Sequence, residues 1–526
     1  MPTIKDQITS MSQFYDTTYY FRELSKYLYE GYVPSAIVSK YAGSYGCASF
    51  KKYSGMHDYS VNGRSYIRKT ANLPVLIGEY IVKNTYAEYP EIANKKAQKE
   101  MDEMFADNDF ARKEKELFET QIHLGGRYIS FYRDKGKFKL KFITADRGFI
   151  TEKKDGKPNG AVFISRTIRM EKAGIGNKLA KFYYTLLEWH YEEDDKRIVK
   201  NDLYRSNTES NLGKKKNDYI TAVYGDLIST EEDVYNISIP TFVYIKNPIK
   251  NNKDLMSIEG IGAFINPIDS IMVVDETFHV MSKEIVLSQF QMLFPEGATE
   301  EVTDWNSNKT VRTVDMYQEG ILVYNTDDVG SYEPKAVAPQ LRIQDQVLAF
   351  NTVIDLVAIS VGIQAGSLRF DGKSFGTATE AKIQKGDTAN TIKLYEANNG
   401  DGITDVIMMW QEVSNSESAL PNVPKFTRED VTILWKDNVA EDDETMREND
   451  RKVIEANLAP RIFYWTQRGF SPEDATKIIE AADADKKKQQ EEFGFSITEE
   501  EVDTNNPDGN EQENEETDDD NDTEIK

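Results

Sequence analysis

Residues 339–393 read PQLRIQDQVLAFNTVIDLVAISVGIQAGSLRFDGKSFGTATEAKIQKGDTANTIK and predict a long apolar helix, a glycine-rich loop and a second helix. On the first helix, one apolar set has the alternating spacings of four and three that mark a heptad-like seam: Ile343, Val347, Phe350, Ile354, Val357 and Val361. A second set occupies another side of that helix: Leu341, Leu348, Val353, Leu356 and Ile359. A helix of about 23 residues is roughly 34 Å long, so we expect copies of the same chain to cover it, with the heptad-like set packed between subunits.

The loop that follows this helix ends in Gly372-Lys373-Ser374, like a phosphate-binding P-loop. The P-loop pattern also requires glycine at position 367, where this chain has serine. A P-loop follows a buried strand, whereas this loop follows a helix. Nucleotide binding is therefore disfavoured here.

A second helix is predicted to begin at Thr377, which can form a capping box with Glu380. The order of Gly372-Lys373-Ser374, Thr377-Ala378-Thr379-Glu380 and Thr391-Ile392-Lys393 after a long apolar helix resembles the portal proteins of tailed bacteriophages. The resemblance is to the type common in phages of Gram-positive bacteria. It spans about residues 70–490 and is strongest over 255–395.

Composition separates a globular body from an acidic tail. The 526 residues carry a formal charge of −25, with 39% hydrophobic and 11% aromatic residues. From Glu499 onward, fourteen acidic residues stand against one base, Lys526, so the tail carries −13 and the body −12. Cys47 is the only cysteine, which excludes an intramolecular disulfide and favours a reducing compartment. No signal peptide or membrane span is predicted, so we expect synthesis in the host cytoplasm.

Hydrophobic periodicity and turn residues predict the remaining elements. Helices are expected at 12–30, at Pro74–Tyr86 with Val75, Leu76, Ile81 and Val82 inward, within 92–121, at 267–287, at 403–413 and within 444–492. Strands are expected at 127–132, 137–144, 161–166, 183–191, 241–245, 310–317, 321–324 and 430–435. The segment Asn398-Asn399-Gly400-Asp401-Gly402 is expected to break the helix that begins near Thr377.

The resemblance implies an α+β portal fold with an antiparallel wing, a two-helix stem, a small α/β clip, a helical crown and a disordered acidic C-terminal tail. Its predicted parts are the N-terminal region and wing 1–266, stem helix 267–288, clip 289–338, stem helix 339–365, channel loop with long helix and return to the wing 366–443, crown 444–495 and tail 496–526.

No catalytic or metal-binding pattern is found. His57, His123, His190 and His279 are scattered and lack the spacing of zinc ligands. Neither a nucleophile elbow nor a dinucleotide-binding glycine fingerprint is present. The sequence therefore predicts a protein that is not an enzyme and has no cofactor.

The negative charge of the body favours a channel through which DNA passes over a surface that binds DNA tightly. Phosphate neutralisation by Lys and Arg dominates affinity for DNA, whereas a ring of chains with a body charge of −12 would repel it. Local attraction is expected at the loop after the first helix. We expect it to project into the channel and touch phosphates through Arg369, Gly372, Lys373 and Ser374, with Lys382 and Lys385 as weaker contacts. The alternative is a solvated loop without a special role.

The resemblance also implies partners. They are other copies of the chain in a twelve-fold ring at one capsid vertex of the virion, scaffold and major capsid protein, the terminase large subunit, head-completion or connector proteins, and double-stranded DNA in transit. Phe294, Trp305 and Tyr317 are candidate clip contacts, although packing within or between clips is the more common role for such side chains. Two other function classes stay open: a nucleotide-using DNA translocase or nuclease, and another structural protein of the phage head.

Overall fold

The computed structural model describes residues 7–8, 18–33, 58–61, 64–134, 136–172, 179–225, 228–229, 232–287, 291–295, 301–304, 309–312, 321–324, 335–337, 342–369, 378–416, 420–435, 462, 464, 475–481 and 484. The chain divides into two units, Met1–Val439 and Ala440–Lys526. All elements named below belong to the first unit. The predicted crown lies mostly, and the predicted tail wholly, outside the described residues.

The larger sheet is antiparallel and has the strand order β10-β9-β8-β7-β6, with β11 also paired to β9. Its strands are β6 (Gly148–Lys154), β7 (Lys157–Lys172), β8 (Leu179–Glu193), β9 (Lys196–Ser206), β10 (Lys214–Lys215) and β11 (Asp233–Tyr235). Two tight turns set its register. Asp155-Gly156 and Asp194-Asp195 all have positive φ angles, the conformation that two-residue hairpins of type I′ require.

A second antiparallel sheet, β12-β4-β5, comprises β4 (Gly126–Asp134), β5 (Lys137–Thr144) and β12 (Phe242–Lys246). It packs against α7 (Phe110–Leu124), which follows α6 (Gln98–Asn108). Gly125 ends α7 with a φ of +86°, and a Cβ there would lie 2.4 Å from the carbonyl oxygen of Gly260. Only glycine fits this helix-to-strand junction. A short antiparallel pair joins β3 (Glu91–Asn94), which precedes α6, to β18 (Val431–Leu434), which is distant in sequence.

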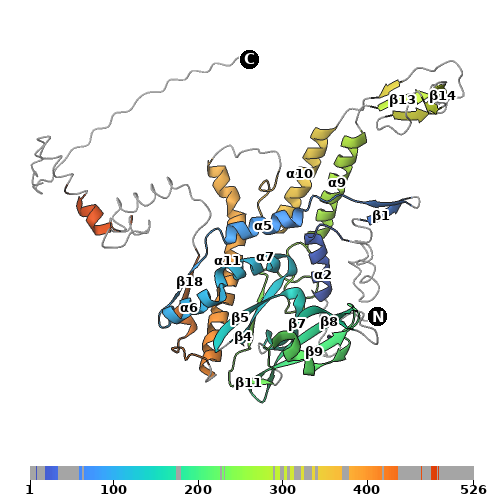
Figure 1. Cartoon of the computed structure of the whole chain (residues 1–526). Coiled ribbons are helices and arrows are strands. Elements are labelled where there is room, and N and C mark those ends of the chain that lie inside the picture. Colours follow the sequence, from blue (N-terminus) through green and yellow to red (C-terminus); the bar gives the residue numbers. More distant parts are fainter. Residues whose placement is uncertain are drawn as a thin grey trace, which may run out of the picture. The chain divides into compact units, whose positions relative to one another are not determined.

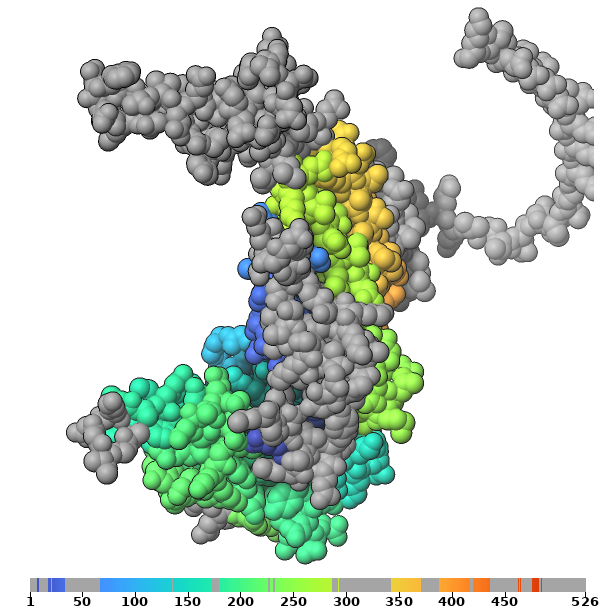
Figure 2. All heavy atoms as spheres, turned by 90° about the vertical axis from the view of Figure 1, so that its right-hand side faces the viewer, coloured from blue at the N-terminus to red at the C-terminus, as the bar shows by residue number. Residues whose placement is uncertain are grey.

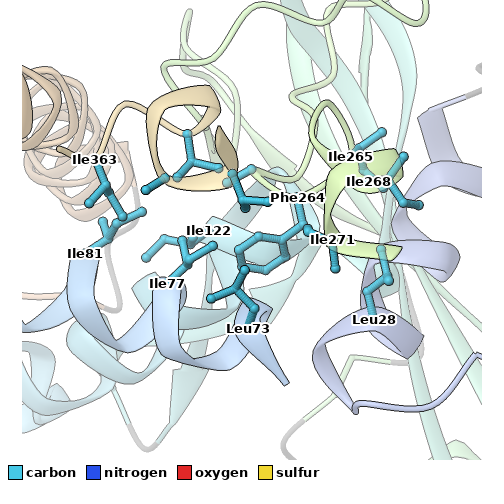
Figure 3. Packing of buried hydrophobic residues seen from close by; sticks show 14 of the residues in the cluster. Leu28, Leu73, Ile77, Ile81, Ile122, Phe264, Ile265, Ile268, Ile271 and Ile363 are labelled. Carbon is cyan, nitrogen blue, oxygen red and sulfur yellow. The ribbon is translucent and has the colours of Figure 1, made fainter. Parts of the chain in front are cut away.

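The main core joins the N-terminal helix to helices far along the chain (Figure 3). Leu28 of α2 (Thr18–Tyr29) and Leu73, Ile77 and Ile81 of α5 (Leu73–Thr85) belong to one cluster with Ile122, Phe264, Ile268 and Ile363. The α+β fold class is confirmed. The predicted helix Pro74–Tyr86 is also confirmed as α5, but Leu76 is exposed and Ile77 takes its inward place.

Among the described residues, two ion pairs have both side chains at most 1% exposed. The guanidinium of Arg22 binds Glu259, and it also donates to the carbonyl oxygens of Leu124 (3.1 Å) and Ala145 (3.2 Å). Arg127 binds Glu114 in the same way. Burial alone lowers the pKa of Arg22, but the Glu259 carboxylate more than offsets this and raises the pKa well above its usual value. Arg22 therefore stays charged and fastens α2 to the loop that precedes the stem.

Arg22→Ala should lower the free energy of unfolding by about 3–5 kcal/mol, because it leaves the Glu259 carboxylate buried without its counter-ion. Urea denaturation followed by tryptophan fluorescence measures this. Arg112→Ala is the matched control, since Arg112 pairs with Asp109 and Glu116 on the exposed face of α7, and it should change stability little. Equal effects of the two substitutions would contradict the role given to Arg22.

The predicted stem helices are α9 (Ile268–Leu287) and α10 (Ile343–Ser360), which lie side by side (Figures 1 and 2). Their directions are opposite, since Arg342 pairs with Glu284 at one end and the rings of Phe350 and Phe278 lie 6.1 Å apart further along. The second helix is shorter at both ends than the predicted stem helix 339–365. Gly362 has a φ of +79°, which α-helices do not contain.

Between these helices the described residues form strands only: β13 (Gln291–Pro295), β14 (Glu301–Asp304), β15 (Lys309–Arg312), β16 (Ile321–Tyr324) and β17 (Lys335–Val337). The predicted strand 321–324 is confirmed as β16, and the predicted strand 310–317 is confirmed only over its first residues. Among the described strands, β13 and β16 alone pair in parallel.

The predicted helix break at 398–402 is wrong. Helix α11 runs unbroken from Ala378 to Ser416. Gly402 serves close packing instead: a Cβ there would lie 2.4 Å from Cδ1 of Ile245 on β12. Asn398 donates to the carbonyl oxygen of Lys246 at 2.7 Å. Tertiary contact with β12 therefore overrides the weak helix propensity of this segment.

Gly402→Ala should destabilise the fold, because Ile245 is buried and β-branched and cannot move aside. Gly400→Ala is its matched partner on the same helix: the new Cβ would lie 3.4 Å from Trp435 Nε1, an ordinary contact. It should stabilise the fold by about 0.5–1 kcal/mol through helix propensity. Thermal melting of both variants measures the difference, and a stabilising Gly402→Ala would refute the packing account.

Candidate functional site

Helix α10 and the chain that follows it contain most of the candidate functional residues. The heptad-like set was predicted to pack between subunits, whereas in the structure most of its members are buried within their own chain. Phe350, Ile354, Val357 and Val361 are buried in the core of their own chain, with exposed fractions of at most 6%. A side chain so covered has almost no surface left for a neighbour. Of the other two members, Val347 is half-buried and Ile343 is exposed.

The other side of α10 is the uncovered one. Leu348 is 69% exposed, Leu356 54% and Ile359 61%. Apolar residues of α9 are about half exposed as well: Val273, Val280 and Ile285. Exposed apolar side chains gathered on one side of a helix indicate an interaction site. We name Leu348, Leu356 and Ile359 the outer face of α10.

The chain after α10 is fastened at its base to both neighbouring helices. Thr391 Oγ1 of α11 donates to the carbonyl oxygen of Gly362 at 2.7 Å, and the amide of Gln364 donates to Thr388 Oγ1 at 3.0 Å. The amide of Gly366 donates to Asp355 Oδ1 of α10 at 2.8 Å. We name residues 361–369 the loop base.

Arg369 also binds Asp355: its Nε donates to Oδ2 at 2.8 Å, and a second guanidinium nitrogen contacts the same oxygen. The sequence predicts a DNA contact for Arg369, whereas the structure shows it engaged by a carboxylate of its own chain. Gly372, Lys373 and Ser374 lie outside the described residues. Lys382 and Lys385 lie on α11, and their side chains are not among those described.

The three candidate clip contacts are only partly placed. Phe294 lies in β13, where it pairs with Val323 of β16. Trp305 and Tyr317 lie outside the described residues.

The histidines for which the structure describes side chains have structural surroundings. His190 contacts Thr241 Oγ1 at 2.6 Å and Glu188 Oε1 at 2.9 Å in the interior of the sheets. His279 lies on α9, where its Nδ1 accepts from the amide of Lys69. His57 lies outside the described residues. Within the described part of the chain, no group of three or more His, Cys, Asp or Glu side chains could hold a metal ion.

His123 is buried against Tyr29, with ring centroids 4.0 Å apart. Burial lowers its pKa from 6.5 to about 4. The folded state therefore binds fewer protons than the unfolded state between these two values. Its contribution to stability is complete above about pH 6.5 and is lost as the pH falls toward 4.

His123→Phe should remove this pH dependence while it keeps the stacking on Tyr29. Relative to the variant, the wild type should lose about 3 kcal/mol of unfolding free energy between pH 6.5 and 4. Urea denaturation at a series of pH values measures the difference. Parallel pH profiles for both proteins would show that His123 titrates normally.

Comparison with known families decides among the function classes that the sequence left open. The family described as "Phage portal protein, SPP1 Gp6-like" matches residues 79–492 of the chain. The chain belongs to this family. A comparison with curated proteins gives no match.

This portal protein is therefore a structural component of the phage virion that functions in DNA packaging. Its family assembles as an oligomeric ring associated with the capsid and the terminase. The predicted resemblance and portal function are both confirmed. Among the described residues, no helix is long and apolar enough to cross a membrane. The match begins after α2, yet α2 supplies Phe21, Leu24 and Leu28 to the main core.

Sequence reasoning missed the residues that hold the loop base. Asp355 was not singled out, although an acid one residue after Ile354 on an apolar helix signals a buried partner. Thr391 was noted only as part of a resemblance, and Thr388 was not singled out. The structure supplies their physical role, since both hydroxyls bond the loop base.

Proposed function

We propose that copies of this portal protein form a dodecameric ring in which the outer face of α10 is covered by the adjacent subunit. The single observation that carries the proposal is the exposure of Leu348, Leu356 and Ile359 on a helix whose opposite side is already buried in its own chain. Burying each of these side chains contributes about 1.5–3 kcal/mol. Association entropy offsets part of this gain, and repetition around a closed ring multiplies the contacts.

In the proposed ring, 1–266 is the N-terminal region and wing, 267–288 and 339–365 the stem, 289–338 the clip, 444–495 the crown and 496–526 a disordered tail. Support for the wing comes from the two antiparallel sheets, and support for the stem comes from the opposed pair α9 and α10. The strands between them support a clip of β structure.

The proposed bore carries double-stranded DNA inward during packaging by the terminase and outward during ejection. The acidic body supports this, because a repulsive wall keeps a polyanion from sticking. The loop after the base would touch phosphates through Gly372, Lys373 and Ser374, with Lys382 and Lys385 nearby on α11.

The ring is proposed to be made in the host bacterial cytoplasm and built into one capsid vertex. There it would nucleate head assembly with scaffold and major capsid protein. The clip, including Phe294, Trp305 and Tyr317, would dock the terminase large subunit and later the head-completion or connector proteins.

Leu356→Asp should abolish ring formation and leave a folded subunit, because it places a charge on the outer face of α10. Mass photometry and negative-stain microscopy of purified protein measure this: the wild type should show rings with an axial hole, and the variant only small species. Leu255→Asp is the matched control. Leu255 is 72% exposed in a turn before α9 and is not part of the outer face of α10, so this variant should form normal rings.

Two results would contradict the proposal. One is a wild-type chain that stays monomeric at every concentration. The other is a Leu356→Asp variant that forms rings as well as the Leu255→Asp control.

A further inference from the structure

Asp355 is an acid on the buried side of an apolar helix. It is 8% exposed and lies between Ile354 and Val357, both of which belong to the main core. A carboxylate in such a place requires donors for its oxygens. Among the described residues, its donors come from the loop base: the amide of Gly366 on Oδ1, and Nε with a second nitrogen of Arg369 on Oδ2.

We propose that Asp355 masks Arg369, so that the base of the channel loop presents no net charge to passing DNA. The proposal rests on the proposed function of the loop and revises the role of one of its residues. Arg369 becomes the anchor of the loop base, and phosphate contact is left to the residues that follow it.

Geometry supports the mask. Planar guanidinium groups bind carboxylates through two donors, and such charge-assisted pairs are stronger than neutral hydrogen bonds. The Arg369 side chain is 39% exposed, whereas that of Asp355 is 12% exposed. The pair therefore lies at the edge of the core, where a phosphate could reach the arginine only in competition with a carboxylate already in place.

The loop base is built to hold this arrangement. Gly366 has a φ of +90°, a conformation that residues with a Cβ rarely adopt, and this turns its amide toward Asp355. Thr388 and Thr391 fix the preceding residues to α11. The pairing of Asp355 with Arg369 thus follows from the backbone conformation of the loop base, which is fixed by hydrogen bonds to α10 and α11.

The functional consequence concerns how strongly the wall of the bore attracts the DNA that moves through it. Each phosphate that a cation neutralises steepens the salt dependence of DNA binding by about 0.9 in the slope of log K against log salt. A ring contains each cation once per subunit. An Arg369 without its carboxylate partner would therefore add one attractive phosphate contact per subunit around the bore. Masking leaves the passage open to a moving duplex.

Asp355→Asn tests the mask on assembled rings. The asparagine retains an oxygen to accept from Gly366, but it no longer holds the guanidinium. We expect short duplex DNA to bind these rings several-fold more tightly at low salt than it binds wild-type rings. The salt slope should be steeper by about 0.9 for each Arg369 that reaches a phosphate. Fluorescence anisotropy over a series of NaCl concentrations measures both.

Two further variants separate masking from a general loss of negative charge. Asp345→Asn removes the same charge from the exposed first turn of α10 and should change DNA binding far less. The double variant Asp355→Asn with Arg369→Gln should lose the gain in affinity. Unchanged binding by Asp355→Asn, or a double variant that binds as tightly as the single one, would overturn the proposal.

If Asp355→Asn fails to assemble into rings, a variant that keeps Asp355 provides the test. Arg369→Lys keeps the cation but loses the two-donor fork, so the lysine should leave Asp355 more readily and raise both affinity and salt slope. Unchanged or weaker binding by this variant would overturn the proposal. Failure of the proposed function is seen separately, as a wild type without rings.

Discussion

Helix α10 is apolar on two sides, and its own chain covers only one of them. The covered side joins a core that draws on α2, α5, α7 and α9, so the helix cannot turn without dismantling the subunit. Its outer face is consequently held in a fixed orientation toward solvent. The core of the subunit is filled, but the apolar side chains on the outer face of α10 remain exposed to solvent. Their exposure favours assembly with identical copies over a free monomer.

Ion pairs in the interior of the molecule hold its structural elements together. Arg22 with Glu259, Arg127 with Glu114, and Asp355 with Arg369 each join elements that are distant in sequence or separated by a turn. The Arg22 pair also shows that residues before the family match belong to the working fold.

Sequence periodicity predicted α9, α10 and most strands of the two large sheets, because each element buries one face and repeats its apolar residues accordingly. It could not tell which side of α10 faces its own chain, since both sides are equally apolar. Glycines misled the prediction for α11: Gly402 marks a close approach to Ile245, a contact distant in sequence. The position of Asp355 within an apolar helix indicates a buried partner. The identity of that partner could not be predicted, because the donors come from a turn whose conformation no sequence pattern specifies.

The unbroken α11 also has a mechanical consequence. At the standard rise, its 39 residues span about 58 Å. Thr388 and Thr391 grip the loop base near one end, while Ile403, Val406 and Trp410 are embedded in a core with the second sheet near the other. A force applied at the loop base would therefore be transmitted along this helix to a core that includes strands of the second sheet.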